Sequence, residues 1–262
     1  MSNTDLPRLE KNEQLRLARE KLKARGLSPT IIGKLNRLKV IDLIYKWGYT
    51  SPTIVQILLE ITKGGYLPKL TDQGLLKKIR LEAIGADIPQ FIYILTNMGL
   101  AEAERHANGL IEYVELNGIK QNLVRHNLLV QATTINAMHQ GVIDDYFSER
   151  MLATQDVLGQ KRVDAVWIKA GIKIGVEMEL TKKWERDLDD FVLKTITAIS
   201  DGKYSQFIIF SDSEAIIKGY TEAIKPGVPL RVWQKNEKGL WRVEKTITVP
   251  DWLLNKVSFQ LL

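Results

Sequence analysis

Three acidic side chains between residues 164 and 179, with the lysine pair that follows them at 182 and 183, have the types and spacing for metal-dependent phosphate chemistry. Glu177 follows Asp164 by 13 positions, Glu179 comes two residues later, and Lys182 and Lys183 follow. Apolar residues alternate with Lys, Gly and Glu over 172–180, so a strand there projects both glutamates from one face, about 7 Å apart along the backbone. Two carboxylates this close are costly unless a cation compensates their charge. Mg²⁺ or Mn²⁺ would do so, and a bound divalent ion orients a phosphate and activates water.

The expected hairpin brings the third acid to the same place. Strands over 162–168 and 172–180 flank a turn at 169–171. Such a turn pairs positions whose numbers sum to 340 or 341, which sets Asp164 opposite Glu177. We therefore predict Asp164, Glu177 and Glu179 as one cluster that holds the metal. The alternative is a half-exposed strand on which Glu177 and Glu179 are merely solvated.

Composition limits the other kinds of chemistry. The 262 residues carry a net charge of +6, which favours a polyanionic partner such as nucleic acid, although a basic surface without a function would have the same charge. Ten Lys and Arg stand against three Glu over 8–39. The chain has no cysteine, which excludes thiolate nucleophiles, disulfides and cysteine-bound zinc. It has no apolar run long enough for a membrane span and no secretory signal at its amino terminus, so we expect a cytoplasmic protein.

The elements around the acids predict a mixed α/β domain over 121–262. A helix over 123–140 precedes the hairpin, and an amphipathic helix begins near Trp184. A buried strand over 206–210, a helix over 213–224 and a strand over 230–234 follow. This order indicates a mixed sheet flanked by helices, within a protein that is α+β overall.

The amino-terminal half predicts a DNA-binding domain. Residues 1–34 form a basic arm, with a helix over 8–25. Helices over 35–47, 52–60 and 72–84, then a strand over 90–95, follow the order of a winged helix-turn-helix domain over 35–120. The third helix would place Lys77, Lys78 and Arg80 in the major groove of DNA. The alternative is a three-helix core on which these side chains are a solvated face.

The spacing of Asp164, Glu177, Glu179 and the two lysines resembles the PD-(D/E)xK nuclease core, which has a restriction-endonuclease-like fold. In that family an aspartate and a second acid bind Mg²⁺ or Mn²⁺, and a lysine polarises the attacking water or the phosphate. Val163 replaces the proline of the motif. Because Glu179 stands at the usual lysine position, the lysine must come from the next turn: Lys183, or Lys182 as its competitor.

A closer resemblance extends over roughly 35–235. The Ile-Leu-Thr-x-x-Gly run over 94–99 and the Arg125-His126 pair, followed by the acids, resemble the replication-relaxation family and the MobC-type plasmid mobilization relaxases. The resemblance implies a bacterial cytoplasmic endonuclease that nicks one strand at a plasmid origin of transfer. Its partners would be double-stranded and nicked plasmid DNA, with an accessory mobilization protein or a coupling protein. The rival interpretation is a non-catalytic DNA-binding accessory or replication regulator built on a nuclease-like scaffold.

Two further side chains are expected near the DNA. His126 would contact a phosphate or assist proton transfer; the alternative, which its position at the start of a helix favours, is an ordinary capping or half-buried role. Lys182 would contact the DNA if Lys183 is the catalytic lysine. The three histidines, at 106, 126 and 139, include no closely spaced pair of the His-x-His kind.

Overall fold

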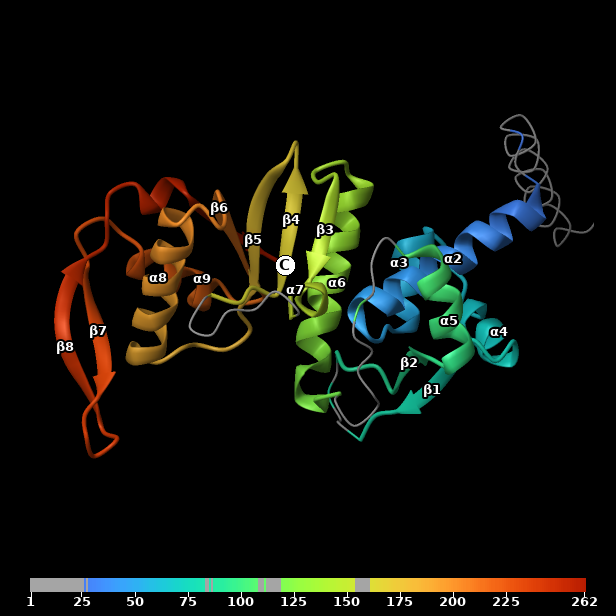
Figure 1. Cartoon of the computed structure of the whole chain (residues 1–262), viewed down its shortest axis with the longest axis horizontal. Coiled ribbons are helices and arrows are strands. Elements are labelled where there is room, and N and C mark those ends of the chain that lie inside the picture. Colours follow the sequence, from blue (N-terminus) through green and yellow to red (C-terminus); the bar gives the residue numbers. More distant parts are fainter. Residues whose placement is uncertain are drawn as a thin grey trace, which may run out of the picture.

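The computed structural model describes residues 26, 28–82, 85, 87–107, 111, 119–153 and 161–262. Helices and several sheets are combined in one chain, which confirms the expected α+β composition (Figure 1). The helix predicted over 8–25 lies outside the described residues. No helix in the described part of the chain is long and apolar enough to cross a membrane.

The amino-terminal half begins with three helices. They are α2 (Pro29–Trp47), α3 (Pro52–Leu59) and α4 (Tyr66–Asp72). Ser28 caps α2 by accepting a hydrogen bond from the backbone N–H of Ile31, and Pro29 occupies the first turn. The predicted start of this helix at residue 35 was therefore too late. Ser51 and Pro52 open α3 in the same way, as predicted.

The predicted third helix over 72–84 is wrong. Helix α4 ends at Asp72, and Gly74 follows with a φ of 74° that side chains other than glycine rarely adopt. The chain then forms β1 (Leu76–Arg80), which pairs antiparallel with β2 (Phe91–Leu95). Lys77, Lys78 and Arg80 therefore lie exposed on a strand and not on a helix. Thr96 caps the next helix, α5 (Asn97–His106).

The carboxy-terminal half contains most of the predicted elements and several that were not predicted, among them β3, β8 and β9. In order they are η2 (Gln121–Leu123), α6 (Val124–His139), β3 (Asp145–Ser148), α7 (Glu149–Ala153), β4 (Ala165–Lys169), β5 (Ile172–Met178), α8 (Glu185–Ser200), β6 (Gln206–Ser211), α9 (Glu214–Ala223), β7 (Pro229–Lys235), β8 (Trp241–Thr248), η3 (Leu253–Asn255) and β9 (Val257–Leu261).

Five of these strands form a mixed sheet in the order β3-β4-β5-β6-β9. Strands β3 and β5 run antiparallel to β4, whereas β6 is parallel to β5 and β9 is parallel to β6. Apolar side chains on one face, including Trp167 and Val176, share a core with α6. Those on the other face, including Val166 and Phe207, share a core with α8 and α9. Because β5 and β6 are parallel, their carboxyl ends meet at one edge of the sheet.

The two halves share a hydrophobic core. Trp47 and Tyr49 from the amino-terminal half belong to the same buried cluster as Val124 of α6. The contact also has a buried polar part, in which the Thr50 hydroxyl donates to the Gln131 side chain and the Gln131 amide donates to the Tyr49 carbonyl. This packing holds α6, and with it His126, against the carboxy-terminal sheet.

Candidate active site

The β4–β5 hairpin has the predicted register. Ala165 pairs with Val176, so their residue numbers sum to 341, and every further pair up to the turn has the same sum. The pairing continues one residue beyond β4, because the Asp164 N–H donates to the Val176 carbonyl over 3.0 Å. The Asp164 carboxylate in turn accepts a hydrogen bond of 2.7 Å from the Met178 N–H. Asp164 is therefore fixed against the end of β5, level with Glu177.

Both glutamates are buried. Glu177 is 8% exposed and Glu179 is 6% exposed, so the alternative in which they are solvated is wrong. Their face of β5 also carries Gly175, where an added Cβ would lie 2.7 Å from the Phe207 ring. β5 thus packs closely against the Phe207 ring of β6 at Gly175, two residues before Glu177.

Lys161 is the partner of Glu177, and no pattern in the sequence predicted this pair. Its Nζ lies 2.7 Å from Glu177 Oε1, and Lys161 is 7% exposed. The same ammonium lies 3.6 Å from the Phe191 ring centroid, so an aromatic face also stabilises it. Burial raises the pKa of Glu177 to about 7; the charge of Lys161 opposes this rise, and the charges of Asp164 and Glu179 add to it. Glu177 Oε1 and the Lys161 ammonium therefore form a buried ion pair.

Of the two predicted lysines, Lys183 is the one that reaches the acids. Its Nζ contacts Glu179 Oε1, whereas Lys182 is exposed to solvent. The Lys183 ammonium also lies 4.8 Å from the Phe191 ring centroid. On the other side, Tyr220 is 2% exposed, and burial together with the charge of Glu179 raises its pKa well above the usual range. Lys183 remains one-third exposed at its side chain, and so connects the buried acids with the surface.

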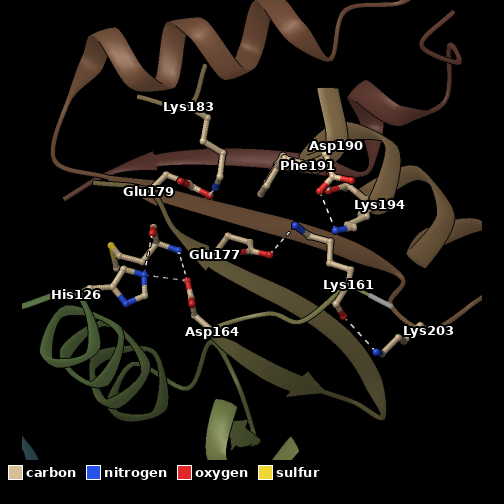
Figure 2. A network of polar contacts seen from close by, with 12 residues as sticks. His126, Lys161, Asp164, Glu177, Glu179, Lys183, Asp190, Phe191, Lys194 and Lys203 are labelled. Atoms are coloured by element: carbon tan, nitrogen blue, oxygen red, sulfur yellow. Dashed lines mark hydrogen bonds and ion pairs between the residues drawn. The ribbon is translucent and has the colours of Figure 1, made fainter. Parts of the chain in front are cut away.

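His126 contacts Asp164 from the first turn of α6. Its Nε2 lies 3.3 Å from Asp164 Oδ2 and 3.0 Å from the Met178 carbonyl oxygen, while Nδ1 lies 3.0 Å from Asn127 Oδ1 (Figure 2). Burial lowers the pKa of His126, but the hydrogen bond and charge of Asp164, with Asn127 and Met178, outweigh it and raise the pKa to about 9. The imidazole is therefore protonated at neutral pH, and both nitrogens donate. His126 does not cap α6; its side chain is half-buried beside the acids.

Each predicted acid thus faces a cation: Asp164 faces His126, Glu177 faces Lys161, and Glu179 faces Lys183 (Figure 2). The three acids come from the facing ends of β4 and β5. In the ranges the structure describes, no three His, Cys, Asp or Glu residues form a group that could hold a metal ion.

The acids nevertheless include a pair that suits a hard divalent cation. Carboxylate oxygens are the ligands such ions prefer. Glu177 offers a buried carboxylate, and Asp164 lies level with it on the neighbouring strand. These two residues would hold a divalent ion, which would then share Glu177 with the Lys161 ammonium. Glu179, the third predicted ligand, is engaged by Lys183.

The remaining predicted DNA contacts lie apart from the acids. Lys77, Lys78 and Arg80 lie on β1 in the amino-terminal half, away from the end of β5 (Figure 1). Lys78 and Arg80 share one face of β1, and Lys78 Nζ lies 3.7 Å from the Phe91 ring centroid. They could contact DNA only at a second place on the molecule.

Comparison of the chain with protein-family models, with curated proteins and with solved structures found no match.

Proposed function

We propose that this protein is a divalent-metal-dependent DNA endonuclease of the relaxase kind, which nicks one strand at a plasmid origin of transfer. One observation carries the proposal: Asp164 and the buried Glu177 lie level on adjacent strands of the β4–β5 hairpin. A buried carboxylate with a strongly raised pKa is costly to maintain, and such groups concentrate at functional sites.

The exposure of each side chain indicates its role in the proposed reaction. A bound Mg²⁺ or Mn²⁺ would supply Lewis-acid chemistry at the phosphate, held by Asp164 and Glu177, with Glu179 as the third predicted ligand. Lys183 is exposed enough to neutralise charge on a phosphate that approaches from solvent. Lys161 is too deeply buried for that task and instead balances the charge of Glu177. His126 positions Asp164.

DNA binding would come from the amino-terminal half. Helices α2, α3 and α4 followed by the β1–β2 hairpin have the order of a winged helix, with α4 in the recognition position. Lys77, Lys78 and Arg80 would then lie on the wing, where basic side chains contact phosphates and set the register of the DNA. Lys182 and the basic residues over 8–39 would add sequence-independent affinity. Within this proposal the partners are double-stranded and nicked plasmid DNA, with an accessory mobilization protein or a coupling protein, in the bacterial cytoplasm.

Nicking of a supercoiled plasmid that carries the DNA flanking this gene tests the proposal. The wild-type protein should produce open-circular plasmid with Mg²⁺ and none with EDTA. Glu177→Ala should abolish nicking while its band shift with the same DNA is kept. Glu222→Ala is the matched control, because Glu222 is an exposed glutamate on α9 paired with Lys225. Nicking by Glu177→Ala at the wild-type rate would refute the proposal.

A second function has an observation of its own in its favour. All three acids already have cationic partners, as they would in a DNA-binding protein that uses a nuclease-like fold as a scaffold. Such a protein would bind the same DNA without cleaving it and without binding Mn²⁺ at the acids.

A further inference from the structure

Large apolar side chains are unusually exposed around the start of α8 and the tip of the β7–β8 hairpin. Trp184, directly before α8, is 78% exposed. At the hairpin, Leu240 is 60% exposed and Trp241 is 45% exposed. One exposed apolar residue needs no explanation, but a group that includes two indole rings marks a binding surface.

Cations accompany these rings. The Arg186 guanidinium lies 4.7 Å from the Trp241 ring centroid, and Lys235 Nζ lies 5.2 Å from it. Lys235 and Trp241 are direct cross-strand partners, which places their side chains on one face of the hairpin. Over 229–248 the hairpin carries five Lys or Arg residues and two Glu residues. The hairpin therefore carries a net positive charge beside the exposed rings, and Arg186 also forms an ion pair of 2.8 Å with Asp187.

A buried acid fixes the hairpin to α8. Asp189 is 8% exposed and accepts hydrogen bonds of 2.8 Å from both Arg231 Nε and Trp233 Nε1. Arg231 also reaches Glu185 over 2.9 Å. These contacts use the polar groups of Arg231 and Trp233 and set the position of the hairpin relative to α8. They do not involve the side chains at the start of α8 and the hairpin tip that we call the aromatic-basic surface: Trp184, Arg186, Lys235 and Trp241.

We propose that the aromatic-basic surface binds single-stranded DNA by stacking bases on Trp184 and Trp241. A base presents a π-face to an indole whatever its sequence, and nearby Arg and Lys neutralise the phosphates between stacked bases. Duplex DNA hides its base faces inside the helix, so this surface discriminates in favour of a single strand. The choice of DNA over RNA rests on the proposed function, whereas the stacking chemistry does not depend on it.

The surface adjoins the candidate active site through a short connection. Trp184 directly follows Lys183, whose ammonium contacts Glu179. A strand stacked on Trp184 would therefore pass the lysine that we assign to the phosphate. A second copy of the chain fits the surface poorly, because two identical basic hairpins would repel each other.

Fluorescence anisotropy with labelled oligothymidylate tests the proposal. An oligomer of about 16 nucleotides spans a typical site, and EDTA keeps the measurement independent of cleavage. The wild-type protein should bind the oligomer. The competition with excess unlabelled duplex uses the double variant Lys77→Ala/Lys78→Ala, in which the proposed duplex site is weakened. In that variant the duplex should displace little of the oligomer. Trp184→Ala and Trp241→Ala should each weaken binding about tenfold, the loss of one stacked base.

Control variants separate stacking from folding and from catalysis. Trp252→Ala removes an indole that is 37% exposed outside the surface and should leave affinity within about twofold of wild type. Trp184→Phe keeps an aromatic face and should retain most of the affinity. Glu222→Ala, on the exposed surface of α9, should bind like wild type. Because the assay contains EDTA, its result does not depend on whether the protein is a nuclease.

Three results would overturn the proposal: absent binding by the wild-type protein, unchanged affinity in both tryptophan variants, or a Trp241→Ala effect on self-association in sedimentation with unchanged DNA affinity. The last would assign the surface to a second copy.

Discussion

Replacing Lys161 with methionine should destabilise the protein strongly, because it leaves a buried carboxylate without its counter-charge. The side chains of Lys161 and Glu177 are only 6% and 10% exposed, so water replaces little of the lost interaction. Removing one partner of a buried ion pair typically costs about 3–5 kcal/mol. Methionine keeps the aliphatic contact with the Phe191 ring, so the loss reports mainly on charge.

The matched control is Lys194→Met. Lys194 and Asp190 are also 2.7 Å apart, but their side chains are 43% and 52% exposed. Because solvent screens such a pair, this variant should lose less than about 1 kcal/mol. Urea denaturation of both variants at about pH 9, where the Glu177 carboxyl of the wild-type protein is ionised, gives the comparison.

Two further measurements make the interpretation specific. The double variant Lys161→Met/Glu177→Gln should recover much of the stability, because the uncompensated charge is gone. The deficit of Lys161→Met should also shrink at a pH well below the Glu177 pKa of about 7, where the carboxyl is protonated and neutral. Equal losses in Lys161→Met and Lys194→Met, or a Lys161→Met deficit that does not change with pH, would refute this account of the site.

Two other predictions concern the same strand. Because the folded protein raises the pKa of Glu177 from 4.5 to about 7, stability from this group is fully present below pH 4.5 and is lost as pH rises through 7, by about 3 kcal/mol. Glu177→Gln should remove this part of the pH dependence in urea unfolding, and an unchanged curve would contradict the assigned burial. Gly175→Ala should cost about 1–3 kcal/mol because its Cβ meets the Phe207 ring. Gly219→Ala on α9 faces open space and should instead stabilise by about 0.5–1 kcal/mol; the reverse order in thermal unfolding would contradict the packing at β5.

The acids could be predicted because they depend on local rules. Strand alternation placed Glu177 and Glu179 on one face, and the turn set Asp164 against Glu177. Their burial was not predictable from alternation alone, since the same pattern describes a half-exposed strand. Burial follows from α8 and α9, which cover that face only once the sheet has assembled.

The cationic partners could not be predicted in the same way. Lys161 meets Glu177 and the ring of Phe191, so its role depends on where α8 packs. His126 reaches Asp164 across 38 positions because α6 packs on the other face of the sheet. Neither contact leaves a periodic or motif-like signal in the chain.

The error at residues 72–84 has a local cause. Leu76, Ile79 and their basic neighbours fit a helical period as well as a strand pattern, and a run this short does not separate the two. Residues 76–80 form a strand because they pair with the apolar strand β2. Gly74 was the available signal, since a glycine at that point ends a helix.

Calorimetric titration with Mn²⁺ tests the central claim most directly, because it asks whether the acids hold a metal without requiring the correct DNA sequence. The account predicts saturable binding by the wild-type protein and its loss in Asp164→Ala, with Asp190→Ala on the surface of α8 as the matched control. No binding by the wild-type protein, or equal binding by Asp164→Ala, would contradict the claim and favour a non-catalytic DNA-binding protein.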